Sequence, residues 1–323
     1  EAGTLEPSPL PRFPAETLAV AIIDDPAEMQ GLAERLRGAP LVALDTETTS
    51  LEPHDAELIG LSLAASATEV WYLPFGHRPR GGELAAPAPV RNLPPITDPA
   101  CAPIADLLRD ATVRKAGQNI KYDWQVLRRA GIELAGVAYD SMLASFVLDP
   151  GRRSHAIDAL SMEHLGRGMR SYTDLTGKGA AQIPFAEVPV TDAAAYCGAD
   201  SATVLALHEI LAPQLREMAL APLLDDLEMP LVEVLVDMEW AGIAIDRPLF
   251  ERLSRDMGAE LARLEGEIQA AAGTTFNLNS PKQLGQVLYE QHQMPVLKKT
   301  RTGPSTDADV LEQLAAMGHE IPR

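Results

Sequence analysis

The sequence predicts an α/β layered domain with a mixed β-sheet, followed by a second part that is mainly helical. Two patterns indicate this arrangement. Up to about residue 139, segments rich in β-forming residues alternate with helical patterns, and two of these segments form a hairpin around "SAT". From about residue 223, no strand pattern longer than "GIAID" occurs, and apolar residues recur at helical spacing.

The elements of the first part follow from local patterns along the chain. The predicted strands are rich in β-forming residues and cover residues 17–23, 40–46, 56–65, 69–75, 112–116 and 136–139. The predicted helices cover residues 25–38, 104–110 and 119–130, and the first of them ends at Gly38. Because the hairpin precedes alternating strands and helices, the sheet is expected to be mixed.

Three helices are expected in the second part. Asp246 followed by Pro248 is typical of a helix start. The apolar residues that follow recur every three or four positions, as in a long amphipathic helix; they are Leu249, Leu253, Met257, Leu261, Leu264 and Ile268. Another helix begins at Ser280-Pro281, and a third covers residues 305–318.

The composition limits the classes of protein. With 323 residues, 46% of them hydrophobic, the chain can form two globular domains. Its apolar runs are too short for a membrane span, and Cys101 and Cys197 have no disulfide-framework or zinc-site spacing, so a cytoplasmic protein is expected. Proline-rich residues 1–16 are expected to form a linker. The net charge of −19 by itself argues against binding of nucleic acid.

Acidic residues in three segments suggest a common site. Asp45 and Glu47 follow an apolar run with one residue between them, so both point to the same face of a strand. Taken alone, this pair favours a solvated turn at the end of the strand. Asp123 lies four residues after Asn119, and Asp200 lies four residues after a tyrosine, each near the start of a helix whose later residues are apolar.

Four carboxylates that converge would repel one another unless cations lie between them. Divalent hard cations such as Mg²⁺ and Mn²⁺ prefer carboxylate oxygens. Two of them neutralise four acids, and in phosphoryl transfer one lowers the pKa of the attacking water while the other stabilises the leaving oxygen. We therefore expect two Mg²⁺ or Mn²⁺ ions as cofactors.

The sequences of these segments resemble the motifs of a known family. "DTE", "GQNIKYD" and "YCGAD" resemble the three motifs of the DnaQ-like 3′–5′ exonucleases, in the branch that has tyrosine where others have histidine. "YDSMLASFVLDP", "TGKGAAQIPF" and "FNLNSPKQLGQVLYEQ" are similar to the polymerase I family of bacterial DNA polymerases (family A). The resemblance covers residues 18–323 and implies a ribonuclease H-like exonuclease domain at 17–222, followed at 223–323 by the beginning of a polymerase domain with thumb-like helices.

The resemblance also implies roles for single residues. Asp45 would bridge both metal ions, Glu47 and Asp200 would complete the tighter metal site, and Asp123 would hold the second ion through water. Tyr196 would orient the attacking water. The residues implied to support or contact the substrate strand are Leu51, Gln118, Asn119, Tyr122 and Tyr172, although ordinary packing is an alternative for Leu51 and Tyr172.

Basic residues are concentrated in two segments. The first comprises Arg152, Arg153, Arg167, Arg170 and Lys178, for which a solvated surface is the favoured interpretation. The second comprises Lys298, Lys299 and Arg301, which are expected to touch the phosphates of duplex DNA. The acids of the metal site account in part for the negative charge, and binding to DNA is expected to be weak and sensitive to salt.

The function expected from the resemblance is a 3′–5′ exodeoxyribonuclease that proofreads misincorporated nucleotides. Its partners would be single-stranded 3′ ends and primer-template DNA, and the protein would be a monomer near the nucleoid, without a membrane association. The polymerase active site is expected beyond residue 323 and a 5′ nuclease before residue 1. Two alternatives stay open, which are an RNA-trimming 3′–5′ exoribonuclease and an inactive exonuclease-like scaffold. Cys197 is expected to be packed rather than reactive.

Overall fold

The computed structural model of the protein describes residues 18–80, 90–301 and 303–323. Its contacts divide the chain into a first compact unit that ends at Gly242 and a second unit from Ile243 to Arg323. The linker expected at residues 1–16 lies outside the described residues. None of the helices in the described ranges combines the length and the apolar character that a membrane span requires.

The first unit is built on a six-stranded mixed sheet with the order β1-β4-β3-β2-β5-β6. Its strands are β1 (Val20–Ile22), β2 (Val42–Thr48), β3 (Leu58–Ala64), β4 (Val70–Pro74), β5 (Lys115–Gly117) and β6 (Val137–Asp140). The β2-β3 and β3-β4 pairs are antiparallel, whereas β1-β4, β2-β5 and β5-β6 are parallel. The predicted α/β class and mixed sheet are therefore confirmed.

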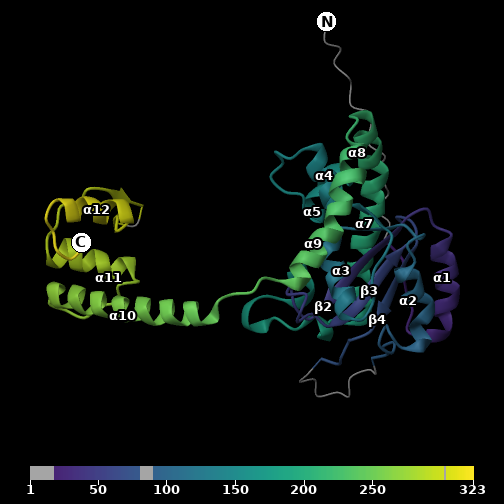
Figure 1. The fold of residues 1–323 in the computed structure, drawn as a ribbon, viewed down its shortest axis with the longest axis horizontal. Helices are drawn as coiled ribbons and strands as arrows, with labels where there is room; N and C mark the ends of the chain where they lie inside the picture. Colours follow the sequence, from purple (N-terminus) through teal and green to yellow (C-terminus); the bar gives the residue numbers. More distant parts are fainter. Residues whose placement is uncertain (1–17, 81–89, 302) are drawn as a thin grey trace, which may run out of the picture. The chain divides into compact units, whose positions relative to one another are not determined.

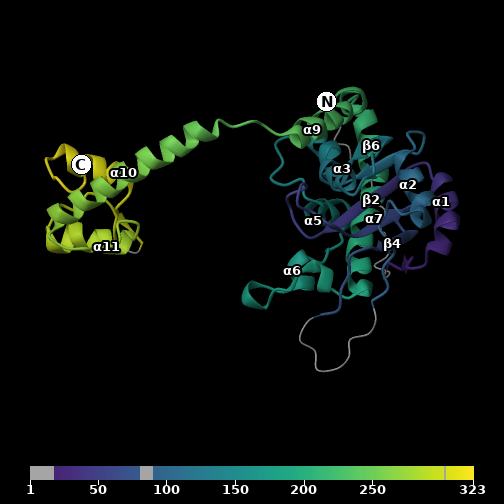
Figure 2. The same cartoon turned by 60° about the horizontal axis from the view of Figure 1, so that its bottom comes forward.

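Helices cover the sheet on both sides. The longer ones are α1 (Met29–Arg37), α2 (Ala102–Arg109), α3 (Ile120–Arg129), α4 (Ser141–Leu148), α7 (Val190–Glu217) and α9 (Met229–Ala241). Short helices include α5 (Ile157–Leu160), α6 (Tyr172–Thr176), α8 (Ala221–Leu223) and the π-helical turns at Ser161–Leu165 and Leu224–Glu228. Helix α7 contacts strands β1 to β5, and α1 and α2 lie together on the side away from it (Figures 1 and 2).

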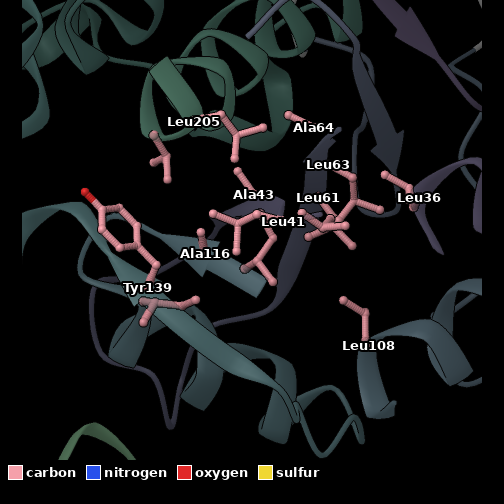
Figure 3. Close-up of a cluster of buried hydrophobic side chains, with 14 of the residues drawn as sticks. Leu36, Leu41, Ala43, Leu61, Leu63, Ala64, Leu108, Ala116, Tyr139 and Leu205 are labelled. Carbon is pink, nitrogen blue, oxygen red and sulfur yellow. The ribbon is translucent and has the colours of Figure 1, made fainter. Parts of the chain in front are cut away.

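The register of the central strands decides which side chains face α7. Asp45 pairs with Ser62, and Ala43 pairs with Ala64, so these residues share one face of the sheet. Leu61 and Leu63 point to the opposite face, where they join Leu36 and Leu108 in the core (Figure 3). The sheet is thus buried on both sides, while one face of β2 carries a carboxylate into the interior.

Small residues let α7 approach the sheet closely. Gly198 faces β1 and β4, and a Cβ atom built there would lie 2.6 Å from Val20 Cγ2 and 3.2 Å from Val70 Cγ1. Ala194 and Cys197 are buried beside it. Because the helix axis can come this near only without larger side chains, the glycine determines how far the α7 side chains reach over β2.

Helix α9 belongs to the first unit, although the sequence suggested that the second part begins near residue 223. It packs against α3 through apolar contacts and ion pairs. Lys121 pairs with Glu239, and Arg128 Nη1 lies 2.8 Å from Asp237. The boundary of the compact unit therefore falls after α9, at Gly242.

The second unit is mainly helical and has a core of its own. It contains α10 (Arg247–Ala272), α11 (Pro281–Gly285), a π-helical turn at Gln286–Gln291 and α12 (Ala308–Ala316), as well as the two-residue strands β7 (Lys299–Thr300) and β8 (Gly303–Pro304). Helices occur where the starts at Asp246, Ser280 and Ser305 predicted them, and the "GIAID" segment is not a strand. Leu288, Val310 and Leu314 form the centre of the core.

Replacement of Gly198 by alanine should lower stability because the new methyl group overlaps β1. We expect the free energy of unfolding to fall by about 1–3 kcal/mol, since overpacking outweighs the gain in helix propensity. Gly31→Ala in α1 is the matched control, because its Cβ meets no atom within 4 Å, and it should stabilise by about 0.5–1 kcal/mol. Urea unfolding measures both, and equal effects would contradict the close approach.

Candidate active site

Strand β2 brings Asp45 and Glu47 to one face, as the alternation of the strand requires. Asp45 lies opposite Ser62 and Glu47 lies opposite Gly60, and the register shifts immediately after Glu47. Glu47 is buried and Asp45 is half-buried. Gly60 is needed there, because a Cβ atom at this position would lie 1.9 Å from the Tyr72 hydroxyl oxygen. The two acids therefore project beneath α7 with little access to bulk water.

Helix α3 supplies Asp123, which is buried next to β2. Its Oδ1 atom accepts hydrogen bonds from the Thr46 amide at 2.9 Å and the Thr46 hydroxyl at 2.6 Å. The threonine between the two strand acids thus ties α3 to β2. Asp140 fixes the start of α3, because its Oδ2 atom accepts the Ile120 amide at 2.7 Å.

Helix α7 supplies Tyr196, Cys197 and Asp200 from its first turns. The Cys197 thiol donates to Asp45 Oδ2 at 3.1 Å. Ligand atoms of Asp45, Glu47 and Cys197 all lie within 4.8 Å of one another. Segments that are 152 residues apart in the chain therefore meet at one point.

The electrostatics of the site reflect four crowded acids. Burial raises the pKa of the Asp45 carboxyl well above its ordinary value, and the charges of the three other carboxylates raise it further. Burial, followed by Asp200 and Asp123, does the same for the pKa of Glu47. Burial raises the pKa of Asp123 and of Asp200 to about 7. The acids are thus close enough to oppose one another's ionisation.

This arrangement fits divalent hard cations. Carboxylate oxygens are their preferred ligands, and the positive charge would relieve the repulsion that raises the pKa of each acid. Asp45, Glu47, Asp123 and Asp200 offer eight carboxylate oxygens, of which Asp123 Oδ1 already accepts from Thr46 and Asp45 Oδ2 from Cys197. The structure therefore brings Asp45 and Glu47 within ligand distance of each other and of Cys197, whereas Asp123 and Asp200 act on this pair through their charges. The carboxylates together are a donor set suited to Mg²⁺ or Mn²⁺.

An aromatic row connects the acids with α6. The rings of Tyr172 and Phe185 stack with centroids 5.9 Å apart, and the Phe185 ring lies 6.2 Å from the ring of Tyr196. Tyr172 is exposed on one side. Its partial burial raises the pKa of its hydroxyl, and the charge of Glu47 raises this pKa further. Leu51 is 91% exposed on the loop after β2. Both predicted contact residues are thus open to a strand that approaches the acids.

The other predicted substrate residues have different surroundings. Gln118 is held inside the protein, because its amide donates to the His155 carbonyl at 2.8 Å and its carbonyl accepts from Ser141. The Tyr122 hydroxyl donates to the Ser50 carbonyl at 2.5 Å, and so it braces the loop that carries Leu51. Asn119 is exposed in a left-handed conformation before α3. Gln118 and Tyr122 therefore have structural partners at the positions where a substrate role was expected.

The three predicted duplex-contact residues lie in the second unit. Lys299 is in β7, and Arg301 is exposed in the turn after it. Lys298 is also exposed, but its Nζ atom lies 3.2 Å from Asp307. The two positive charges at Lys299 and Arg301 therefore form the solvent-facing part of this cluster.

A cavity of about 610 Å³ opens beside α7. Tyr196 and Asp200 line one side, residues 166–170 line another, and Thr68 of the β3-β4 turn closes an end. Arg170 of this wall forms an ion pair with Asp192 at 3.6 Å. Within the described part of the chain, Asp200 is the one of the four acids that lines this cavity.

Three residues of this site were missed by the sequence reasoning. Thr46 was visible between the two acids, but its bond to Asp123 depends on α3 lying against β2. Phe185 lies in a segment that the family resemblance included without a role for it. Cys197 was expected to be only packed; it is buried as expected, and it also donates to Asp45. Its position directly after Tyr196 was the available signal.

Comparisons with known proteins agree on one family. Residues 20–216 match a family model described as 3′–5′ exonuclease, and residues 247–323 match one described as DNA polymerase family A. The DNA polymerase I of Pseudomonas aeruginosa is 39% identical over 320 residues, which cover 96% of this chain and 34% of that protein. The DNA polymerase I of Rhizobium leguminosarum is 38% identical over 339 residues, covering 99% of this chain and 33% of that protein.

A solved structure is also similar to this chain. The "POL domain of Pol1 from M. smegmatis complex with DNA primer-template and dNTP" matches with a TM-score of 0.66 and 25% identity. The match covers 94% of this chain and 46% of the solved one. The chain spans about a third of the length of the two curated relatives.

Asp45→Asn should stabilise the metal-free protein at pH 8. Because the pKa of Asp45 is raised on folding, its contribution to stability is present below the unfolded pKa and is lost as the pH rises. An asparagine cannot ionise, so we expect a gain of about 1–3 kcal/mol at pH 8 and a smaller gain at pH 5. Urea unfolding in EDTA measures both values. The exposed Asp55→Asn is the control, and a gain that does not depend on pH would contradict the argument.

Proposed function

The chain belongs to the 3′–5′ exonuclease family of the family A DNA polymerases, and on this premise we propose that it hydrolyses DNA from the 3′ end and so proofreads misincorporated nucleotides. The observation that carries the proposal is the placement of Asp45 and Glu47 on one face of β2, next to Asp123 of α3 and beneath α7, which carries Asp200; the charges of Asp123 and Asp200 raise the pKa of both strand acids. An inactive scaffold has no need of such a cluster, because buried acids without a bound cation lower the stability of the protein.

The chemistry assigned to the site is hydrolysis of the terminal phosphodiester. Asp45, Glu47, Asp123 and Asp200 would hold two divalent cations, which supply the Lewis acidity that activates water and stabilises the leaving oxygen. The hydroxyl of Tyr196 would accept a hydrogen bond from the attacking water or donate one to it. Burial and the neighbouring acids raise the pKa of this tyrosine, so its hydroxyl stays protonated and polar at neutral pH.

The surroundings of the acids support a single-stranded substrate. Leu51 and Tyr172 are exposed and would contact the last bases of the strand, since aromatic and apolar side chains stack on bases without regard to sequence. The site is buried beneath α7, so the terminal nucleotide must leave a duplex to reach it. We therefore assign frayed or mispaired 3′ ends of DNA as the substrate, and primer-template DNA as the partner.

The second unit is assigned to the polymerase part of the family. It matches family A over residues 247–323, and we propose that residues 223–323 begin that domain with thumb-like helices. The catalytic role proposed for this chain is assigned to the exonuclease unit at residues 17–222. We place the protein in the cytoplasm near the nucleoid, as a monomer.

Asp45→Ala tests the assigned chemistry. With Mn²⁺, the wild-type chain should shorten a 5′-labelled DNA oligomer one nucleotide at a time, and the variant should be slower by at least about 100-fold because it loses a ligand of both metal ions. Denaturing gels follow the products, with Asp55→Asn as the control. A variant as fast as the wild type would overturn the site assignment.

The choice of nucleic acid is tested with the same assay. DNA and RNA oligomers of equal sequence are compared at equal concentration, and mispaired 3′ ends are compared with fully paired ones. We expect faster degradation of DNA and of mispaired ends. A strong preference for RNA would favour an exoribonuclease, and no cleavage of either strand would favour the scaffold.

Binding to duplex DNA should depend on the exposed basic side chains of the second unit. Each phosphate contact contributes a slope of about −0.9 to the plot of log affinity against log salt concentration. The double variant Lys299→Gln, Arg301→Gln should therefore make the slope shallower by about 2, whereas Lys282→Gln on α11 should leave it unchanged. Fluorescence anisotropy in EDTA measures this, and equal slopes would rule out the predicted contacts.

A further inference from the structure

The buried thiol of Cys197 has a geometry that packing alone does not require. We propose that Cys197 is a positioning residue, whose S–H group holds the Asp45 carboxylate in the orientation that accepts divalent cations. The inference rests on the proposed function, since it concerns how the same acids are prepared for the metal ions.

The thiol lies near both strand acids and its hydrogen bonding lowers the pKa of Glu47 as well, but its short, directed contact is with Asp45. Cys197 Sγ lies 3.1 Å from Asp45 Oδ2 and 3.5 Å from the Asp45 carbonyl oxygen. A thiol has one hydrogen, and the carboxylate oxygen is both the nearer and the more strongly charged acceptor. Within the described ranges, Cys197 is the side-chain donor to this carboxylate. The bond thus constrains one of its two oxygens.

The direction of the thiol is itself constrained. Ser62 lies opposite Asp45 on the neighbouring strand, and its hydroxyl donates to the Cys197 carbonyl at 2.9 Å. The same hydroxyl contacts Ser201, one turn further along α7. Gly198 lets this part of the helix approach the sheet. The backbone of Cys197 is therefore fixed over the Asp45–Ser62 pair, and its side chain is aimed at the carboxylate.

A donor in this position should matter because groups that hydrogen-bond to metal ligands orient them and tune their affinity. Removal of such partners commonly weakens metal binding by about 10–100-fold. A thiol is a weaker donor than an imidazole or an amide, so we expect an effect below this range, about 3–10-fold.

The chain provides a matched control for the loss of a buried thiol. Cys101 is also fully buried in the first unit, but its Sγ atom faces the Pro94 carbonyl at 3.6 Å. Cys101→Ala therefore removes the same group from the same unit without touching the acids. An effect on Cys197 that reflected general loosening of the core would appear in both variants.

The experiment measures Mn²⁺ binding by the full chain without any turnover. Free Mn²⁺ is followed by electron paramagnetic resonance during titration of the wild type, Cys197→Ala, Cys197→Ser and Cys101→Ala. We expect Cys197→Ala to raise the half-saturating Mn²⁺ concentration about 3–10-fold. Cys197→Ser keeps a donor and should stay within about twofold of the wild type, and Cys101→Ala should match the wild type.

The outcomes separate this inference from the proposed function. If the wild type binds Mn²⁺ and Cys197→Ala binds it equally well, the positioning role is overturned and the metal site stands. If the wild type does not bind Mn²⁺, the proposed function falls and the inference falls with it. Should Cys197→Ala fail to fold, Cys197→Ser decides, because a loss greater than twofold in that variant overturns the donor role.

Discussion

Repulsion among the buried carboxylates is the constraint on which the first unit depends, because the surrounding elements must hold these acids together. Four acids from β2, α3 and α7 raise one another's pKa in a site with little water. Such a cluster lowers the stability of the metal-free protein, so the surrounding elements must hold the acids in place against their tendency to separate. Divalent cations would turn this loss of stability into a gain, because they bind the assembled acids and not the unfolded chain.

Hydrogen bonds from residues that are not assigned a chemical role hold the acids in place. Thr46 binds one oxygen of Asp123, and Asp140 secures the start of the helix that carries it. On the other side, Ser62 fixes α7 and Cys197 reaches Asp45. Asp45 and Asp123 therefore each have a protein donor on one oxygen, and their other oxygens stay available for cations.

The second unit has a different physical character. Its core is small, whereas the apolar stripe of α10, which includes Leu253, Met257 and Leu261, is exposed. The first unit contains the acids and α9, whose ion pairs with α3 attach the end of that unit to the helix bearing Asp123.

The sequence by itself determined the α/β class, the order of the elements and the choice of Asp45, Glu47, Asp123 and Asp200 as candidate metal ligands. These follow from local rules, because strand alternation places Asp45 and Glu47 on one face and helical spacing places Tyr196 beside Asp200. Tertiary structure alone decided that Thr46 binds Asp123, that Phe185 joins Tyr172 to Tyr196, and that Gln118 is occupied internally. It also aimed Cys197 at Asp45, 152 residues away. Such contacts depend on how closely α7 packs on the sheet, and no local pattern in the chain specifies a distance between distant segments.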